Sequence, residues 1–164
     1  MLNLNRFYSI SFVLICSFLV MGCLPFGSDD NSKEPKLIII NVLDKPDFND
    51  SHIKGSINIP FDDFEGKISS LSKINHYVVY CADYMCMSSG FCAKLLKDAG
   101  FEHVWAYEGG MAEWYQKGYA TEGPSKSDYL KGESIDMSDD EESEMSIITA
   151  EQLVEKIEQF ESNK

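Results

Sequence analysis

The sequence predicts an α/β fold built around a central parallel β-sheet. Three short, nearly continuous apolar runs at 37–42, 77–80 and 104–107 have the composition of strands buried on both faces of such a sheet. Helical patterns alternate with these runs. Because open sheets of this kind place their sites at the carboxyl ends of the strands, the pattern also predicts where function is located.

The N-terminus has the pattern of an export signal. Arg6 precedes an apolar run over 7–20, which is short for a membrane span of about 20 residues. The run ends in 19–23 (LVMGC), which resembles the lipobox of bacterial lipoproteins. This resemblance implies cleavage before Cys23 and lipidation of its thiol, which would hold the protein on a membrane in the cell envelope. An uncleaved anchor helix is the alternative.

The residue that follows Cys23 indicates the membrane to which such a lipoprotein would be sorted. Position 24 is Leu, and the absence of Asp there favours outer-membrane sorting if the cell has two membranes. We therefore expect the chain at the periplasmic or extracytoplasmic face of a membrane, attached through lipid on Cys23.

Composition changes along the chain predict the domain boundaries. Pro, Gly, Ser and Asp enrich the segment after the lipobox, which is typical of a tether, and an acidic, turn-rich stretch separates the main domain from the C-terminus. The predicted segments are a signal peptide (1–22), a tether (23–35), an α/β domain (36–124), an acidic linker (125–146) and a C-terminal strand-helix element (147–162).

Helices are expected at 62–71, 88–99 and 111–117, with Gly100 and Gly118 as C-terminal stop residues for the last two. The C-terminal element contains a further amphipathic helix. It begins with a capping-box pattern, and its apolar residues share one helical face. The capping pair is Thr149 and Gln152, and the apolar face is formed by Leu153, Val154, Ile157 and Phe160.

The charge of the chain excludes a class of partner. The formal net charge is −13, and the 14 Lys and Arg residues do not cluster. A protein that binds nucleic acid needs a basic patch to neutralise phosphates, so no nucleic-acid partner is expected.

Cys81 lies directly after the run 77–80, where a loop and then the 88–99 helix follow. Loop N–H groups and the positive end of the helix dipole stabilise a thiolate in such a position, and the thiolate is the nucleophilic form of cysteine. The alternative is a buried cysteine that acts as a small hydrophobic residue. Cys86 lies in the same loop, whereas Cys92 lies among apolar residues of the helix and is interpreted as core.

Several ordered motifs across about 36–123 resemble the rhodanese family. They are SHIKGSINIP at 51–60, VVYC at 78–81, GF at 100–101 with Val104, and EGGM at 108–111 with Trp114. The resemblance implies a rhodanese-like α/β fold with a parallel sheet of about five strands, flanked by helices. It also implies that Cys81 carries sulfane sulfur as a persulfide, so the predicted partners are a small sulfur donor or a protein thiol acceptor.

The chain departs from the family pattern at the positions where positive charge is expected. Active members often carry an arginine in the loop after the cysteine, but 82–89 (ADYMCMSS) contains neither Arg nor Lys. The Asp-Val-Arg that commonly ends the first strand is Asn41-Val42-Leu43 here. Without these charge-assisted contacts, thiosulfate should bind weakly and phosphatase chemistry is not expected.

The candidate site therefore consists of two cysteines and the loop between and after them. The catalytic candidates are Cys81 and Cys86, and the substrate-loop candidates are Ala82, Asp83, Tyr84, Met85, Met87 and Ser88. No cofactor or metal is expected, because Cys92 belongs to the helix and His52, His76 and His103 are not spaced as ligands. His52 is interpreted by family position as a residue that fixes its loop.

Three functions remain open at this point. Cys81 could serve a sulfurtransferase or sulfur carrier, or Cys81 and Cys86 could form a thiol-disulfide redox module, since a nearby thiol can resolve a persulfide or sulfenic acid. A catalytically silent binding domain is the third. Glycines 109 and 110 could let the backbone come close to the cysteine loop, but the turn into the last helix of the domain suffices to explain them.

The family resemblance also predicts a permutation. Rhodanese domains normally open with a strand and helix that resemble I-T-x-x-E-L, and here that pattern occurs at 148–153 instead. We predict that 147–162 docks where the N-terminal element of the family would lie. The alternative is a tail helix that binds something else or nothing.

Overall fold

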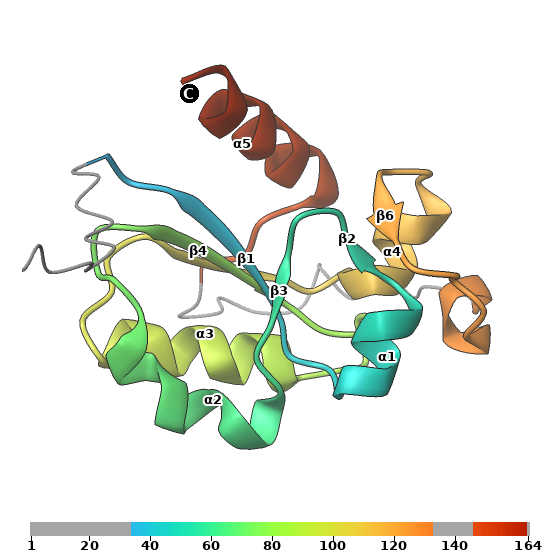
Figure 1. Ribbon diagram of the computed structural model, residues 1–164, viewed down its shortest axis with the longest axis horizontal. Coiled ribbons are helices and arrows are strands. Elements are labelled where there is room, and N and C mark those ends of the chain that lie inside the picture. The colour runs from blue at the N-terminus through green and yellow to red at the C-terminus, as the bar shows by residue number, and fades with distance from the viewer. Residues whose placement is uncertain (1–33, 133–145, 164) are drawn as a thin grey trace, which may run out of the picture. The chain divides into compact units, whose positions relative to one another are not determined.

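A computed structural model describes residues 34–132 and 146–163 of the chain. Its centre is a parallel sheet of four strands in the order β3-β1-β4-β5 (Figure 1). The strands are β1 (Leu37–Asn41), β3 (Ile57–Asn58), β4 (His76–Tyr80) and β5 (Val104–Tyr107). Two further strands, β2 (His52–Ile53) and β6 (Thr121–Glu122), pair antiparallel beside the sheet.

Helices cover both faces of the sheet. The elements are α1 (Lys45–Asp50), α2 (Phe61–Lys67), the 3₁₀ turn η1 (Ile68–Ser70), α3 (Ser88–Asp98), α4 (Gly110–Gln116), the 3₁₀ turn η2 (Asp128–Lys131) and α5 (Ala150–Ser162). In Figure 1, α2 and α3 lie on one face of the sheet, and α4 and α5 lie on the other. The predicted α/β class with a central parallel sheet is therefore confirmed.

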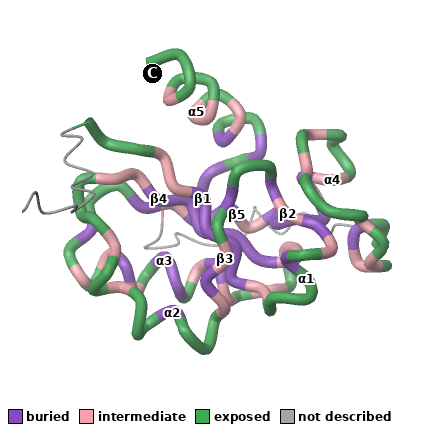
Figure 2. Tube along the Cα trace, viewed as in Figure 1, coloured by how far each residue is buried: buried purple, intermediate pink, exposed green. Residues whose placement is uncertain are grey.

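Side chains of each strand alternate between two hydrophobic cores. On β1, Ile40 packs in the core beneath α2 and α3, whereas Ile39 packs in the core beneath α4 and α5. On β4, Val79 and Val78 divide in the same way. Since both faces are covered, these strands have no polar face, which explains their nearly continuous apolar sequence. Buried residues accordingly concentrate along β1, β4 and β5 (Figure 2).

The expected sheet of about five strands has four strands among the described residues. At the free edge of β5, Ile147 forms an isolated parallel bridge with Ala106. The backbone N–H of Ala106 donates to the Ser146 carbonyl at 3.0 Å, and the N–H of Ile148 donates to the Ala106 carbonyl at 2.9 Å. The C-terminal segment thus covers the edge of the sheet without forming a full strand.

Helix α5 packs on the domain directly after this bridge. Its start carries the predicted capping box between Thr149 and Gln152, and both reciprocal hydrogen bonds are present. Ala150 and Leu153 are completely buried in the core beneath α4 and α5. Lys117, which follows the last residue of α4, donates to Glu151 at 2.7 Å. The C-terminal element therefore docks on the domain, while its equivalence to the opening element of the family stays a prediction.

The ordered domain extends beyond the boundary predicted at Pro124. The N–H groups of Lys126 and Ser127 donate to the carboxylate of Asp50, and the side chain of Leu130 in η2 is completely buried. A hydrogen bond from the Ser127 side chain lowers the pKa of Asp50, and these two backbone hydrogen bonds lower it further. The acidic linker was expected to begin at residue 125, but the residues up to Gly132 pack against the domain because η2 covers α4.

The predicted signal peptide, Cys23 and most of the predicted tether lie outside the described residues, as do residues 133–145 of the predicted linker. Within the described ranges, no helix is both long and apolar enough to cross a membrane.

Candidate functional site

Cys81 lies at the carboxyl edge of the sheet. The register aligns the last residues of three neighbouring strands, Asn41 of β1, Tyr80 of β4 and Tyr107 of β5. Cys81 follows Tyr80 directly, and only 2% of its surface is exposed. The position is therefore the one that the strand pattern predicts for a site in an open α/β sheet.

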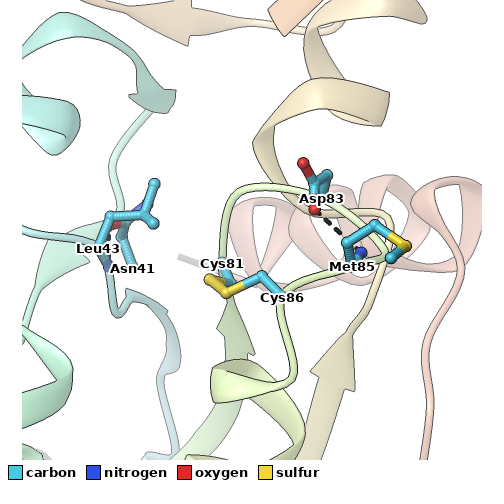
Figure 3. Close-up of a disulfide and its surroundings, with 6 residues drawn as sticks. All are labelled: Asn41, Leu43, Cys81, Asp83, Met85 and Cys86. Carbon is cyan, nitrogen blue, oxygen red and sulfur yellow. Dashed lines mark hydrogen bonds between the residues drawn. A yellow bond between two sulfur atoms is a disulfide. The ribbon is translucent and has the colours of Figure 1, made fainter. Parts of the chain in front are cut away.

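A disulfide joins Cys81 to Cys86, and the Cα atoms of the pair are 6.1 Å apart (Figure 3). Cys86 is half-buried and packs at the margin of the core beneath α3. Cys81 and Cys86 are therefore close enough to exchange between a dithiol and a disulfide without moving the sheet.

Backbone hydrogen bonds hold the loop between these cysteines. The carboxylate of Asp83 accepts from the N–H of Met85 at 2.9 Å, and its carbonyl accepts from the N–H of Cys86 at 3.1 Å. The start of α4 is tied to the same loop, because the N–H of Met111 donates to the Cys81 carbonyl at 3.0 Å. The loop is thus held both by hydrogen bonds to Asp83 within it and by a hydrogen bond from the start of α4.

The predicted loop residues differ in their exposure. Met85 and Met87 are exposed, whereas the four others are partly buried: Ala82, Asp83, Tyr84 and Ser88. Figure 3 shows the Met85 side chain extending away from the disulfide. A donor that approaches Cys86 would therefore meet methionine side chains and an uncharged or acidic loop.

Gly110 lies close to the Cys81 loop, as the close-approach interpretation of the glycine pair expects. Its φ of +60° is a conformation that favours glycine, and a Cβ atom at this position would lie 2.7 Å from the Asp83 nitrogen. The interpretation of glycines 109 and 110 as a simple turn is therefore incomplete. The absence of a side chain at Gly110 lets α4 approach the Cys81 loop closely enough to hydrogen-bond its carbonyls.

A Gly110→Ala substitution should destabilise the domain by about 2–3 kcal/mol, because it combines an unfavourable φ with backbone overlap. The free energy of unfolding from urea denaturation measures this effect. Gly66→Ala is the matched control, since a Cβ atom on Gly66 has no heavy atom within 4 Å. Equal unfolding free energies for the two variants would contradict the role of Gly110.

The hydroxyl of Tyr80 connects the end of β4 to the loop over 51–56. It accepts the N–H of Ile53 at 3.0 Å and lies 2.9 Å from the hydroxyl of Ser56. Burial raises the pKa of Tyr80, so the phenol remains protonated at neutral pH. Sequence reasoning missed this contact, although it links two of the motifs that carry the family resemblance.

Asn41 occupies the end of the first strand, where the family pattern has Asp-Val-Arg, and it pairs with Asn58 of β3. Asn41 is completely buried, and its side-chain oxygen accepts the N–H of Leu43 at 2.9 Å. Asn58 donates to the Leu43 carbonyl at 2.8 Å. These contacts shape the turn beside the disulfide (Figure 3). No cation is supplied from 41–43 or from 82–89.

Cys92 and His52 have structural roles outside the candidate site. Burial raises the pKa of the Cys92 thiol to about 12, so this cysteine stays protonated in the core. His52 donates from Nδ1 to the Phe48 carbonyl at 2.8 Å, which agrees with its predicted role in fixing the loop. Within residues 34–132 and 146–163, no cluster of three or more His, Cys, Asp or Glu residues could hold a metal ion.

The comparison with family models matches residues 28–117 to the rhodanese-like domain. The chain belongs to the rhodanese-like domain family. The match includes the strand that ends at Cys81, the loop to Cys86 and the helix α4 that contacts this loop.

Two curated proteins are similar to this chain in sequence. A thiosulfate sulfurtransferase, GlpE of Shewanella oneidensis, is 30% identical over 78 residues, which cover 48% of this chain and 75% of that protein. An HTH-type transcriptional regulator, Rv0324 of Mycobacterium tuberculosis, is 28% identical over 79 residues. The chain spans about a third (34%) of that regulator's length.

Solved structures show the same rhodanese-like arrangement. BH2092 of Bacillus halodurans is 27% identical with a TM-score of 0.52, over 57% of this chain and 69% of that one. Alr3790 of Anabaena is 38% identical with a TM-score of 0.50, over 55% of this chain and 70% of that one. These likenesses support the fold of the domain around Cys81.

Proposed function

We propose that this protein is an exported, lipid-anchored sulfur carrier or sulfurtransferase that holds sulfane sulfur as a persulfide on Cys81. The observation that carries the proposal is the place of Cys81, at the carboxyl end of β4 in a rhodanese-like domain, within disulfide reach of a second loop cysteine. The family includes a thiosulfate sulfurtransferase of similar sequence, which supports sulfur transfer as the reaction class.

The first step requires Cys81 as a free thiolate. This thiolate attacks the terminal sulfur of a donor persulfide, R–S–SH, so that the donor S–S bond breaks, R–S⁻ leaves, and Cys81–S–SH forms. Cys81 is followed by the loop that leads into α3, and the positive end of the α3 dipole would stabilise the negative charge of the thiolate. No redox change beyond this exchange is required.

Cys86 supplies a second step in the same loop. Its thiolate attacks the Sγ atom of the Cys81 persulfide, the Cys81–Cys86 disulfide forms, and the outer sulfur leaves as HS⁻. A dithiol reductant must then return both cysteines to thiols. The Cys81–Cys86 disulfide of the structure is the bond that this step would form.

The charge of the loop favours a particular donor class. Residues 82–89 contain Asp83 but no Arg or Lys, so a dianion such as thiosulfate lacks a cationic partner there. A persulfide of a small thiol or of a protein needs no such contact. We propose persulfides as the donors and place the protein on the extracytoplasmic face of a membrane, held by lipid on Cys23.

A thiol-disulfide redox module is the second candidate function, and the Cys81–Cys86 disulfide favours it. In this function, the pair would exchange electrons with partner thiols and would not take up sulfur.

Cys86→Ser distinguishes these functions. The reduced protein, freed of small thiols, is mixed with glutathione persulfide in a single turnover, and sulfide release is measured with the mass of the protein. The wild-type chain is expected to release about one sulfide per chain and to end as the disulfide, whereas Cys86→Ser retains the extra sulfur.

Two outcomes would contradict the proposal. Sulfide release by Cys86→Ser at the wild-type rate would remove Cys86 from the reaction. A Cys86→Ser variant that gains no sulfur on Cys81 from the persulfide, while the wild-type chain still forms the disulfide with an oxidant, would support the redox module. Cys92→Ser is the matched control, since the Cys92 thiol is buried and outside the loop.

A further inference from the structure

An exposed apolar surface adjoins Cys86. It consists of Met85, Met87, Phe91 and Phe61, which we call the loop face. The exposed fractions of these side chains are 69%, 86%, 54% and 41%, respectively. Contiguous apolar exposure of this kind is uncommon on a soluble domain and marks an interaction site.

The members of the loop face form a continuous row. Met87 and Phe91 are four residues apart on α3 and share one side of the helix, where the N–H of Phe91 donates to the Met87 carbonyl. The ring of Phe91 lies 5.7 Å from the ring of Phe61 at the start of α2. Met85 and Met87 flank Cys86 in the sequence. The row therefore begins at the disulfide and runs across α3 to α2.

The two sulfur atoms of the disulfide differ in access. Cys81 is 2% exposed, whereas Cys86 is only half-buried and lies between the two exposed methionines. An incoming thiolate therefore reaches Cys86 more readily and displaces Cys81 as the leaving thiolate. The leaving group is then Cys81, the buried cysteine that follows the carboxyl end of β4.

We propose that the loop face is the docking surface for a protein dithiol that reduces the Cys81–Cys86 disulfide, an inference that rests on the proposed function because Cys81 must be a thiol to accept sulfur. One partner thiolate attacks Cys86 and forms a mixed disulfide while Cys81 leaves as a thiolate. The second partner thiol then displaces Cys86 and closes the partner disulfide. Two electrons and two protons pass from the partner to this chain.

The charge and apolar character of the loop face indicate which surface its partner should have. The loop face has no cation in 82–89, and Asp62 and Asp63 lie beside Phe61 in the first turn of α2. A partner with an acidic rim around its cysteine would be repelled, whereas an apolar and neutral or basic rim is complementary. Exposed methionines adapt their shape to such a surface.

The test compares a protein reductant with a small one. Met87→Gln, Phe91→Gln and the double variant remove apolar surface without adding charge, and Ile74→Gln is the control. Ile74 is 48% exposed and precedes β4, at the end of the strand opposite Cys81. The oxidised chain is mixed with reduced thioredoxin or with dithiothreitol, and the free thiols are trapped by alkylation and counted by mass spectrometry.

The double variant is expected to be reduced at least ~10-fold more slowly by thioredoxin and within about twofold of the wild-type rate by dithiothreitol. Ile74→Gln should match the wild-type chain with both reductants. Equal thioredoxin rates for the double variant and the wild-type chain would overturn the proposal. A dimer in solution that dissociates on Phe91→Gln would also overturn it, by assigning the loop face to a second copy.

Failure of this inference is separate from failure of the proposed function. The reduction rates report docking and disulfide exchange only, and they do not depend on sulfur uptake. A chain that gains sulfur on Cys81 but shows no loop-face effect would retain the proposed function without the proposed partner surface.

Discussion

A Cys81→Ser variant is expected to take up no sulfane sulfur. The serine hydroxyl is protonated at neutral pH and is a far weaker nucleophile than a thiolate, so the rate of sulfur transfer should fall by at least ~100-fold. Cys81 is buried at the end of β4, and serine is similar in size, so the fold should persist. Sulfide release in the presence of a persulfide donor and excess dithiol measures the effect.

The Cys81→Ser result is informative when it is paired with Cys86→Ser under the same conditions. With excess dithiol, an external thiol can replace Cys86 as the attacking group, so Cys86→Ser should retain much of the wild-type turnover. Similar turnover by Cys81→Ser and the wild-type chain would mean that sulfur is carried elsewhere. The melting temperature of each variant confirms that the comparison is made between folded proteins.

Leu153→Ala is expected to destabilise the domain by about 3–5 kcal/mol, the range measured for leucines truncated in well-packed cores. Leu153 belongs to α5 and is completely buried in the core beneath α4 and α5. If α5 were a tail that binds elsewhere, this truncation would have almost no effect. Urea denaturation of the purified chain measures the change in the free energy of unfolding.

Glu158→Ala is the matched control on the exposed side of the same helix, where a change within about 0.5 kcal/mol is expected. A chain that ends at Gly132 extends the test, because it removes the bridge to Ala106 together with α5. An unchanged melting temperature for that shortened chain would contradict the integration of the C-terminal element and would also exclude the permutation.

Local patterns in the sequence were sufficient for the main elements of the fold. The runs at 37–42, 77–80 and 104–107 became β1, β4 and β5 within one residue at each end. The capping box at Thr149 and Gln152 is present as predicted. These features depend on hydrophobic periodicity and on contacts within one helical turn, which neighbouring residues determine.

Features that depend on distant contacts were not predictable. Strands β2, β3 and β6 contain two residues each, too few for a periodic pattern, and form only where another segment lies beside them. The close approach of Gly110 to the Asp83 nitrogen is also a tertiary contact, and the sequence offered it only as one of two interpretations of the glycine pair. The buried end of the predicted linker at Leu130 was missed because its surrounding sequence is polar.

In the candidate site, too, local features could be predicted from the sequence and features that depend on distant contacts could not. The position of Cys81 after an apolar run predicted its place at the sheet edge, and the family resemblance indicated its chemistry. Spacing alone left the pairing of Cys86 open, since a loop of this length allows either orientation of the thiol. The role of the Tyr80 hydroxyl was also hidden, because its partners Ile53 and Ser56 are more than 20 residues away in sequence.

Peptide mass spectrometry on Cys81 tests the central claim most directly. A soluble chain that starts at Leu24 is reduced, freed of thiol and incubated with a persulfide donor, with Cys86→Ser used to trap the product. We predict a mass gain of about 32 Da on the peptide that contains Cys81, reversed by dithiothreitol. An unmodified Cys81 peptide whose thiol still reacts with an alkylating agent would contradict sulfur transfer by this domain.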